Sequence, residues 1–322
     1  MIKKVLGMGN AVLDILAETT DNYLLRNKLT KGSMTLVDQK VSENLEKQLD
    51  FVKKDSGGSV ANSMAGISML GGEALFCGKV KNDKLGIDFQ KSMEKTGTKF
   101  LCELSKTGLP TARCIVLVTP DGERTMQTFL GASTTLDEKD INESFFDDVS
   151  FLLVEGYLWS SESARSAIKK AVNFCKKRKI QVVFSLSDPG LVKMYKSDFQ
   201  NFLEKDVDIL IGNESEFFEI FETNENDALN KNFSNSEKFG VMTQSSKGAT
   251  IFKDGQTINV KTPKVTKVVD TTGAGDMFAA GFLFKLQNHH SLESSAEFGC
   301  RVASKIISHF GARASEALKD IV

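Results

Sequence analysis

Residues 270–276 read Asp270-Thr271-Thr272-Gly273-Ala274-Gly275-Asp276 and lead directly into the apolar run Met277-Phe278-Ala279-Ala280-Gly281-Phe282. The spacing of the apolar residues predicts a helix that begins at the glycine-rich turn. Gly273 and Gly275 have no side chain to block a backbone approach, so the first amides of this helix can face a negatively charged oxygen, assisted by the helix dipole. The turn is therefore predicted to be an anion site with the carboxylate of Asp276 beside it.

A second glycine-rich segment, Gly57-Gly58-Ser59-Val60-Ala61-Asn62, lies far upstream and leads into another apolar helical run. Its glycines would let backbone amides meet a ligand closely, and Asn62 offers both a donor and an acceptor to a hydroxyl group. Each segment alone also fits an ordinary turn that caps a helix, and that alternative stays open. Together they predict phosphoryl transfer, in which Asp276 takes a proton from an attacking hydroxyl while amides hold the phosphoryl charge.

Both segments resemble motifs of the pfkB, or ribokinase-like, family of carbohydrate and nucleoside kinases, and the resemblance runs from Gly7 to Gly311. It implies an ATP-dependent kinase. Arg124 aligns with an arginine of the family that swings from a lid toward the transferring group, and an exposed hairpin charge is the alternative. The residues that the resemblance assigns to catalysis are Asp276 as the base, the amides of Gly273, Ala274 and Gly275, and Arg124.

The run Gly7-Met8-Gly9-Asn10-Ala11-Val12-Leu13-Asp14-Ile15 closes the first predicted strand. A dinucleotide fingerprint would need a third glycine near position 12 and then a helix, and Val12 with the extended run after it excludes that interpretation. Asp14 suits a bidentate acceptor for two adjacent hydroxyls, and a solvated turn acid is the alternative. The run is similar to the adenosine kinase branch of the family. The expected substrate-binding residues are Asn10, Asp14, Gly57, Gly58 and Asn62.

Two later segments are expected to bind ATP. The segment 213–216, Asn-Glu-Ser-Glu, resembles the Asn-x-x-Glu element that organises hydrated Mg²⁺ in the family, and it also fits a helix N-cap with its Glu partner. The segment 243–248 stands where the family carries a Thr-x-Gly element, with Ser245 in place of the glycine. The resemblance assigns cofactor binding to Asn213, Glu216, Thr243, Ser245, Gly248 and Gly275, water-bridged Mg²⁺ to Asn213 and Glu216, and a monovalent cation, K⁺, to Asp270 and Thr272 beside the loop 311–315.

The resemblance implies phosphorylation of the primary hydroxyl of a nucleoside, with adenosine as the expected substrate and AMP and ADP as products. The chain departs from animal adenosine kinases at Met34, where those carry a polar amide, and at Glu155, where those are apolar. A free-sugar kinase of the ribokinase or fructokinase type and a non-catalytic nucleoside or sugar binder remain alternatives. The segment 56–65 contains no Lys or Arg, which argues against a substrate that already bears a phosphate.

Composition limits the other classes of partner. The chain has 322 residues, 41% of them hydrophobic, and its 41 basic and 42 acidic residues are mixed along its length, so no nucleic-acid or membrane partner is expected. No secretory or membrane-spanning segment is expected either. Five widely spaced cysteines are typical of buried thiols in a reducing cytoplasm. We expect a cytoplasmic monomer or homodimer that binds small molecules.

Apolar strands, beginning at residues 2–8, alternate with amphipathic helices along most of the chain. This order predicts a ribokinase-like α/β fold of three layers, with a mostly parallel central sheet, helices on both faces, and ligands at the carboxyl ends of the strands. Segments 14–38 and 100–131 alternate apolar and polar residues and predict a small β lid within a single domain, 1–322. The polar segment 222–236 is expected to be a loose surface insertion.

Overall fold

The central sheet places the carboxyl ends of seven neighbouring parallel strands along one edge, where ligands of open α/β sheets bind. Its nine strands follow the order β14-β13-β12-β11-β10-β9-β1-β5-β6, and β13 and β14 are antiparallel additions. The strands are β1 (Lys4–Met8), β5 (Glu73–Cys77), β6 (Lys99–Phe100), β9 (Val149–Glu155), β10 (Gln181–Ser185), β11 (Ile209–Asn213), β12 (Phe239–Thr243), β13 (Ala249–Lys253) and β14 (Gln256–Val260).

The computed structural model describes residues 3–234, 237–309, 311–313, 318 and 321. Position 2 at the start of the first predicted strand, position 236 at the end of the predicted insertion, and positions 314 and 315 of the predicted cation loop lie outside these residues.

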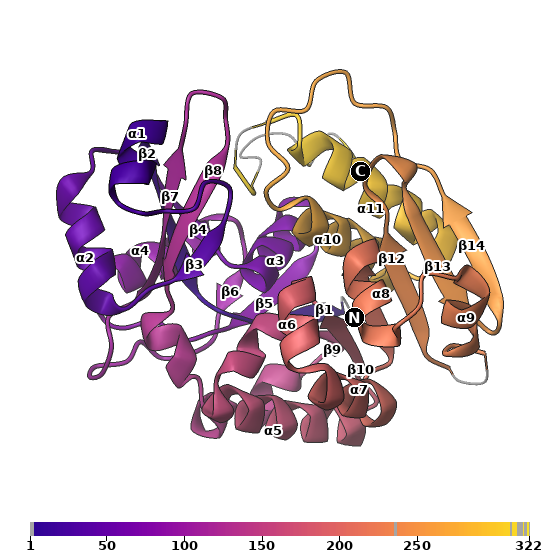
Figure 1. Cartoon of the computed structure of the whole chain (residues 1–322). Helices are drawn as coiled ribbons and strands as arrows, with labels where there is room; N and C mark the ends of the chain where they lie inside the picture. Colours follow the sequence, from indigo (N-terminus) through magenta and orange to yellow (C-terminus); the bar gives the residue numbers. More distant parts are fainter. Residues whose placement is uncertain (1–2, 235–236, 310, 314–317, 319–320, 322) are drawn as a thin grey trace.

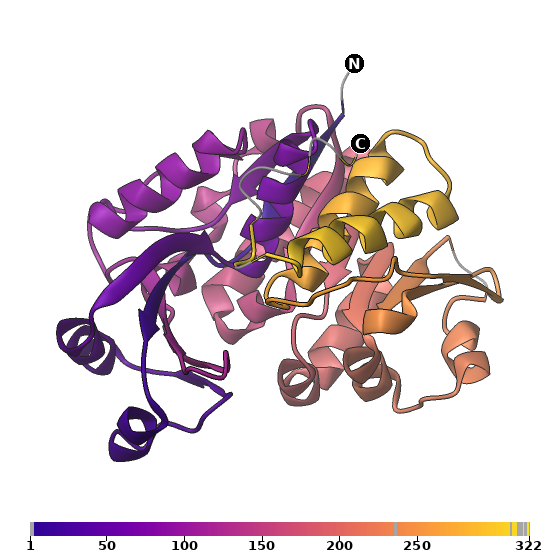
Figure 2. The ribbon, with the colours of Figure 1, turned by 90° about the horizontal axis from the view of Figure 1, so that it is seen from above.

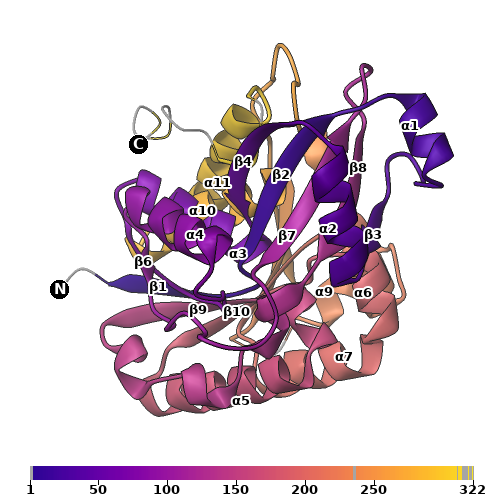
Figure 3. The ribbon, with the colours of Figure 1, turned by 90° about the vertical axis from the view of Figure 1, so that its left-hand side faces the viewer.

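Helices cover both faces of the sheet, as the alternating pattern predicted (Figures 1 and 3). One layer contains α3 (Ser59–Met69), α4 (Lys84–Lys95), α10 (Ala274–Gln287) and α11 (Leu292–Ile306). The other contains α5 (Glu162–Arg178), α6 (Pro189–Met194), α7 (Lys196–Lys205) and α8 (Glu214–Phe221), and α9 (Asn226–Lys231) lies beside β13. Short 3-10 turns occur at Gly131–Thr135, Glu138–Asp140, Glu143–Phe146, Gly156–Ser160 and Ser245–Lys247.

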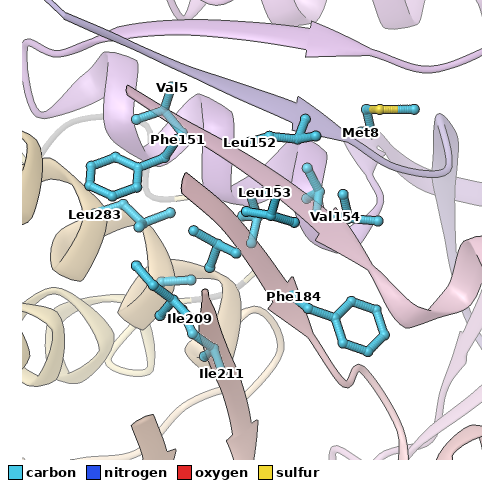
Figure 4. Packing of buried hydrophobic residues seen from close by; sticks show 14 of the residues in the cluster. Val5, Met8, Phe151, Leu152, Leu153, Val154, Phe184, Ile209, Ile211 and Leu283 are labelled. Carbon is cyan, nitrogen blue, oxygen red and sulfur yellow. The ribbon is translucent and has the colours of Figure 1, made fainter. Parts of the chain in front are cut away.

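The core lies between these layers, because the central strands are apolar along nearly their whole length, as in sheets buried on both faces. Leu152 and Leu153 are adjacent in β9 and both are almost completely buried. Figure 4 shows them with Val5, Phe184 and Leu283, which come from β1, β10 and α10. None of the described helices is both long and apolar enough to cross a membrane.

A second sheet forms the lid, with strand order β3-β8-β7-β2-β4, and it lies to one side of α10 and α11 (Figure 2). The hairpin strands that were predicted outside the main sheet belong to this second sheet. The predicted lid boundaries are wrong in two respects, since β4 also belongs to this sheet and residues 99–100 form β6 of the central sheet. Its elements are β2 (Val12–Glu18), β3 (Met34–Leu36), β4 (Phe51–Gly57), β7 (Ala112–Val118), β8 (Arg124–Phe129), α1 (Asp21–Arg26) and α2 (Gln39–Gln48).

Two further details differ from the sequence-based expectations. Asp14 lies within lid strand β2 and pairs with Asp55 of β4, so it is not at the end of the first strand. The segment 222–236 contains α9, whose Leu229 is buried, as is Phe233 just after it. The part of this segment from Asn226 to Phe233 is therefore packed against the core, because its apolar side chains recur at helical spacing within a polar sequence.

Candidate active site

Asp276 lies in the first turn of α10 and directs its carboxylate toward the first turn of α3. Its Oδ1 accepts a hydrogen bond from the hydroxyl of Ser59 (2.6 Å), and its Oδ2 accepts one from the side-chain amide of Asn62 (2.9 Å). Burial raises the pKa of Asp276, while these hydrogen bonds and the charge of Arg313 act in the opposite direction. The two glycine-rich segments, far apart in sequence, thus meet at one carboxylate.

The acceptor side of the site continues from this carboxylate to the lid. An added Cβ on Gly57 would lie 2.5 Å from Oδ2 of Asp14, so the carboxyl group of Asp14 rests directly against the glycine pair. Burial raises the pKa of Asp14 to about 7, and the charge of Arg313 partly offsets this effect. The structure therefore places Asp14 against the glycine pair that precedes Asn62, with the loop that carries Asn10 beside it. This group of residues is called the acceptor pocket below.

Gly58 shows how tightly this pocket is built, and replacing it with alanine is expected to disrupt the pocket. Its φ is +92°, and an added Cβ would lie 2.3 Å from the carbonyl oxygen of Asn10. The Gly58→Ala variant must therefore move the Asn10 loop in addition to bearing backbone strain. We expect acceptor KM to rise at least roughly tenfold, and stability to fall by about 1–3 kcal/mol more than in the control below.

The matched control is Gly71→Ala, just after the same helix. Gly71 has a φ of +89°, but no atom lies within 4 Å of the added Cβ, so this variant carries the backbone strain without the collision. Urea unfolding and acceptor kinetics compare the two proteins. Equal effects of both substitutions would show that the close approach to Asn10 does not matter.

The residues expected to bind the nucleotide lie at a cavity of about 740 Å³, which is within the range of small-molecule sites. It lies beside the amino end of α10, since Ala274 and Gly275 line it while the carboxylate of Asp276 turns to α3. Five of the residues that were expected to bind the cofactor line this cavity: Asn213, Thr243, Ser245, Gly248 and Gly275. Apolar side chains also line it, among them Phe278.

Three backbone amides at the start of α10, those of Gly273, Ala274 and Gly275, were expected to face an anion, and the structure differs from this expectation at Ala274. Gly273 adopts a left-handed φ of 76°, and the turn that it makes lets the amide of Ala274 donate to the carbonyl of Thr271 (3.2 Å). The Ala274 amide is therefore engaged within the turn. Among the described residues, the structure records no partner for the amides of Gly275 and Asp276, which makes these two the candidate donors to an anionic oxygen.

Asn213 and Glu216 form a complete capping box at the start of α8. Glu216 accepts from the Asn213 backbone amide (2.9 Å) and side-chain amide (2.8 Å), while its own backbone amide donates to the Asn213 side chain (3.0 Å). Of the two, Asn213 lines the cavity and Glu216 does not. The capping alternative is thus present in the structure, and Glu216 acts on the cavity by orienting Asn213.

The buried carboxyl groups of this site give stability a defined pH dependence. Burial raises the pKa of Glu216 to about 7 from an ordinary value of 4.5, and burial has the same effect on Glu155 and Asp14. Between these values the unfolded chain releases a proton that the folded chain keeps, so the free energy of unfolding falls as pH rises from about 4.5 to 7. We expect Glu216→Gln to reduce that slope by up to about 1.4 kcal/mol per pH unit.

Urea unfolding at several pH values between 5 and 7 measures this slope. The control is the substitution Glu162→Gln, because Glu162 lies in the first turn of α5 and is exposed to solvent. An unchanged slope in Glu216→Gln would mean that Glu216 is ionised in the folded protein over the whole range.

Arg124 extends from lid strand β8 to the segment that precedes α10. Its Nη1 donates to the hydroxyl of Thr272 (2.8 Å), its Nη2 is paired with Asp270, and Asp270 also accepts from the amide of Gly311 (2.7 Å). The two side chains expected to hold K⁺ therefore hold a guanidinium in this structure. Arg124 thus joins the lid to the segment before α10, and it is not among the residues that line the cavity.

Three side chains at the site were not identified as functional from the sequence. Ser59 follows the glycine pair, and its position at the first residue of a helix is the signal that could have found it. Glu155 is buried and accepts hydrogen bonds from the backbone amides of Asn10 (2.7 Å) and Val60 (2.9 Å). The signal in the sequence was an acidic residue at the carboxyl end of an apolar strand. Arg313 donates from Nε to Asn62 (2.9 Å), and nothing in the local sequence indicates that contact.

The chain is similar in sequence and in fold to known kinases. Residues 32–319 match the model of the pfkB family carbohydrate kinases. The solved structure of an adenosine kinase from Sinorhizobium meliloti is 33% identical, with a TM-score of 0.91 over 99% of this chain and 98% of that one.

Two curated relatives are similar to this chain at nearly equal identity. The adenosine kinase of Saccharomyces cerevisiae is 27% identical, with 94% of each chain covered. The 5-dehydro-2-deoxygluconokinase of Bacillus subtilis is 28% identical, with 86% of this chain and 88% of that one covered. The predicted ribokinase-like fold and kinase activity are both confirmed. This chain belongs to the pfkB family of carbohydrate kinases.

Proposed function

We propose that this kinase phosphorylates the primary hydroxyl of a nucleoside, adenosine in the first place, and converts adenosine and ATP to AMP and ADP. One observation carries the proposal. The first turn of α10 lies between two pockets, with Gly275 on the nucleotide cavity and the Asp276 carboxylate bonded to the acceptor-side residues Ser59 and Asn62. A proton acceptor beside a phosphate-binding turn is the arrangement that phosphoryl transfer to an alcohol needs.

The roles of the chain's own residues follow from this arrangement. Asp276 accepts the proton of the attacking hydroxyl, and its raised pKa makes it a stronger base than an exposed aspartate. The amides of Gly275 and Asp276 face the phosphoryl oxygens at the positive end of α10. Asn213 faces the nucleotide cavity and is held by Glu216, where it fits a contact to ATP-bound hydrated Mg²⁺. Magnesium bound with ATP would neutralise phosphate charge.

The lid supports a nucleoside over a free sugar. Asp14 pairs with Cys114, and two residues further along, Leu16 pairs with Val116, which in turn pairs with Met126. Residues two apart in a strand share a face, and directly paired residues share it too. The surface that continues from Asp14 is therefore apolar. Leu16 and Val116 are already buried, so the exposed part of this surface is at its Met34 end. A purine base has a flat apolar face to pack there, whereas a free sugar offers less apolar area.

Met34, the residue where this chain departs from animal adenosine kinases, extends the same surface. It lies in β3 directly opposite Met126 and is 45% exposed. A methionine side chain adapts its shape to a flat ring and makes favourable contacts between its sulfur and aromatic atoms. The departure thus keeps the lid suited to a base, with packing in place of a hydrogen bond.

A sugar kinase is the second candidate, because 5-dehydro-2-deoxygluconokinases are as similar to this chain as the yeast adenosine kinase is. An ADP-release assay separates the candidates when it is run with adenosine, inosine, guanosine, ribose, fructose and 5-dehydro-2-deoxygluconate. We expect the highest kcat/KM with adenosine. Turnover with free sugars alone would overturn the nucleoside assignment, and no turnover with any acceptor would favour a binding protein.

A further inference from the structure

Arg313 lies at the active site because the two residues before it, Gly311 and Ala312, pack against the catalytic turn. The amide of Gly311 donates to Asp270 (2.7 Å), and an added Cβ on Gly273 would lie 2.6 Å from the Cβ of Ala312. The Arg313 Nε then donates to the Oδ1 of Asn62 (2.9 Å). Asn62 is itself bonded to Asp276, so the arginine is two hydrogen bonds away from the candidate base.

The end of the Arg313 guanidinium is buried without a bond. Its Nη1 and Nη2 atoms are shielded from solvent, and neither has a hydrogen-bond partner within the described part of the chain. An unsatisfied buried donor of a charged group is costly, so these atoms need a partner, which a ligand can supply. The arrangement indicates a binding residue whose partner arrives with the substrate.

The charges around Arg313 place it on the acceptor side of the site. Burial lowers its pKa, and the carboxylates of Asp14, Asp55 and Asp276 oppose that effect, with Asp14 the largest of the three. The hydrogen bond from its Nε to Asn62 places the guanidinium beside the glycine-rich segment that ends at this asparagine. Three carboxylates around one guanidinium also leave a negative balance that disfavours an anionic acceptor.

The hydrogen-bonding chemistry of this pair matches a vicinal diol. A hydroxyl carries one proton to donate and two lone pairs that accept. A carboxylate can take only the protons, and a guanidinium, which has five donors and no acceptor, can serve only the lone pairs. One carboxylate and one guanidinium on the same pocket therefore satisfy both halves of two neighbouring hydroxyls.

We propose that Arg313 is a specificity-determining residue that donates its Nη1 and Nη2 hydrogens to the oxygens of the vicinal diol whose protons Asp14 accepts. This inference rests on the proposed function of the same site, and it predicts that the kinase selects acceptors with two adjacent hydroxyls. Acceptors that lack either hydroxyl leave one guanidinium donor unsatisfied, which is the kind of mismatch that a polar site rejects strongly.

The test combines one substitution with three ligands. Dissociation constants for adenosine, 2′-deoxyadenosine and 2′,3′-dideoxyadenosine are measured by calorimetry for the wild type and Arg313→Met. We expect the substitution to weaken adenosine binding roughly 10- to 100-fold, the range for hydrogen bonds from a charged group, and to change dideoxyadenosine binding less than about threefold. With ATP present, KM for adenosine should rise while kcat changes little.

Arg26→Met serves as the control, because Arg26 is an exposed arginine at the end of α1. Arg313→Lys keeps the charge with fewer directed donors and provides a folded alternative if the methionine variant unfolds, and it should lose diol selectivity in the same direction. Equal losses for all three ligands would overturn the proposal, because the diol would then not be what Arg313 recognises. A fall in kcat with unchanged KM would also overturn it and would place Arg313 on the phosphoryl group. If nucleosides do not bind at all but ribose does, the nucleoside function fails, and the same comparison with ribose and 2-deoxyribose tests Arg313 separately.

Discussion

Replacing Asp276 with asparagine is expected to lower kcat by roughly two to four decades, the usual contribution of a general base. The neutral amide has nearly the same size but cannot take a proton from the attacking hydroxyl. The effect on binding should be small, because the oxygen of an asparagine can keep one of the two hydrogen bonds that Ser59 and Asn62 now donate. KM values for both substrates are therefore expected to change only a fewfold.

Three measurements check this expectation. Steady-state kinetics give kcat, calorimetry gives adenosine affinity without turnover, and thermal unfolding shows whether the variant is folded. Asp198→Asn is the matched control, since Asp198 is an exposed aspartate in the first turn of another helix, α7. Full turnover in Asp276→Asn would remove this carboxylate from the mechanism, and loss of adenosine binding in proportion to kcat would show that its role is structural.

The sequence was sufficient to predict the parts of the site that depend on local chemistry. The turn before α10 and the glycine pair before α3 were predicted because glycine at those positions permits backbone conformations and approaches that few other residues allow. Their meeting at Asp276 depends on the packing of α3 against α10, where an added Cβ on Gly66 would lie 2.7 Å from the Cβ of Ala280. Neither segment follows one of the parallel strands, since α3 follows lid strand β4 and α10 follows the edge strand β14. Local pattern thus explains why the two turns were predictable, and the packing of the two helices explains why they meet.

The sequence could not predict contacts made by long side chains between distant segments. Arg124 reaches Asp270 across 146 positions, and Arg313 reaches Asn62 across 251, and no periodicity records such pairs. The position of Asp14 was not predicted either, since it was expected at a strand end and lies within a lid strand. Its partner Asp55 belongs to β4, a strand whose charged sequence, with Lys54 and Asp55, gives a weak strand signal.

Glu155 should give the largest loss of stability of the substitutions considered, although the sequence showed it only as an acid in an unexpected place. It ends β9, is 1% exposed, and accepts from the Asn10 amide with Oε1 and from the Val60 amide with Oε2. Gly58, at the N-cap of α3, has no side chain to cap the helix. Glu155 therefore provides the cap from another strand and joins the two loops of the acceptor pocket.

Glu155→Ala leaves two buried amide donors without a partner, at about 1–3 kcal/mol each, so we expect the free energy of unfolding to fall by about 2–6 kcal/mol. Glu155→Gln keeps one accepting oxygen and should lose about half as much, and Glu162→Ala, an exposed glutamate in α5, should change little. Because the bonds position the Asn10 loop and the start of α3, acceptor KM should rise in the same order as stability falls. Urea unfolding with acceptor kinetics tests both effects. If Glu155→Ala were as stable as Glu162→Ala, water would have replaced the carboxylate, and this residue would not organise the pocket.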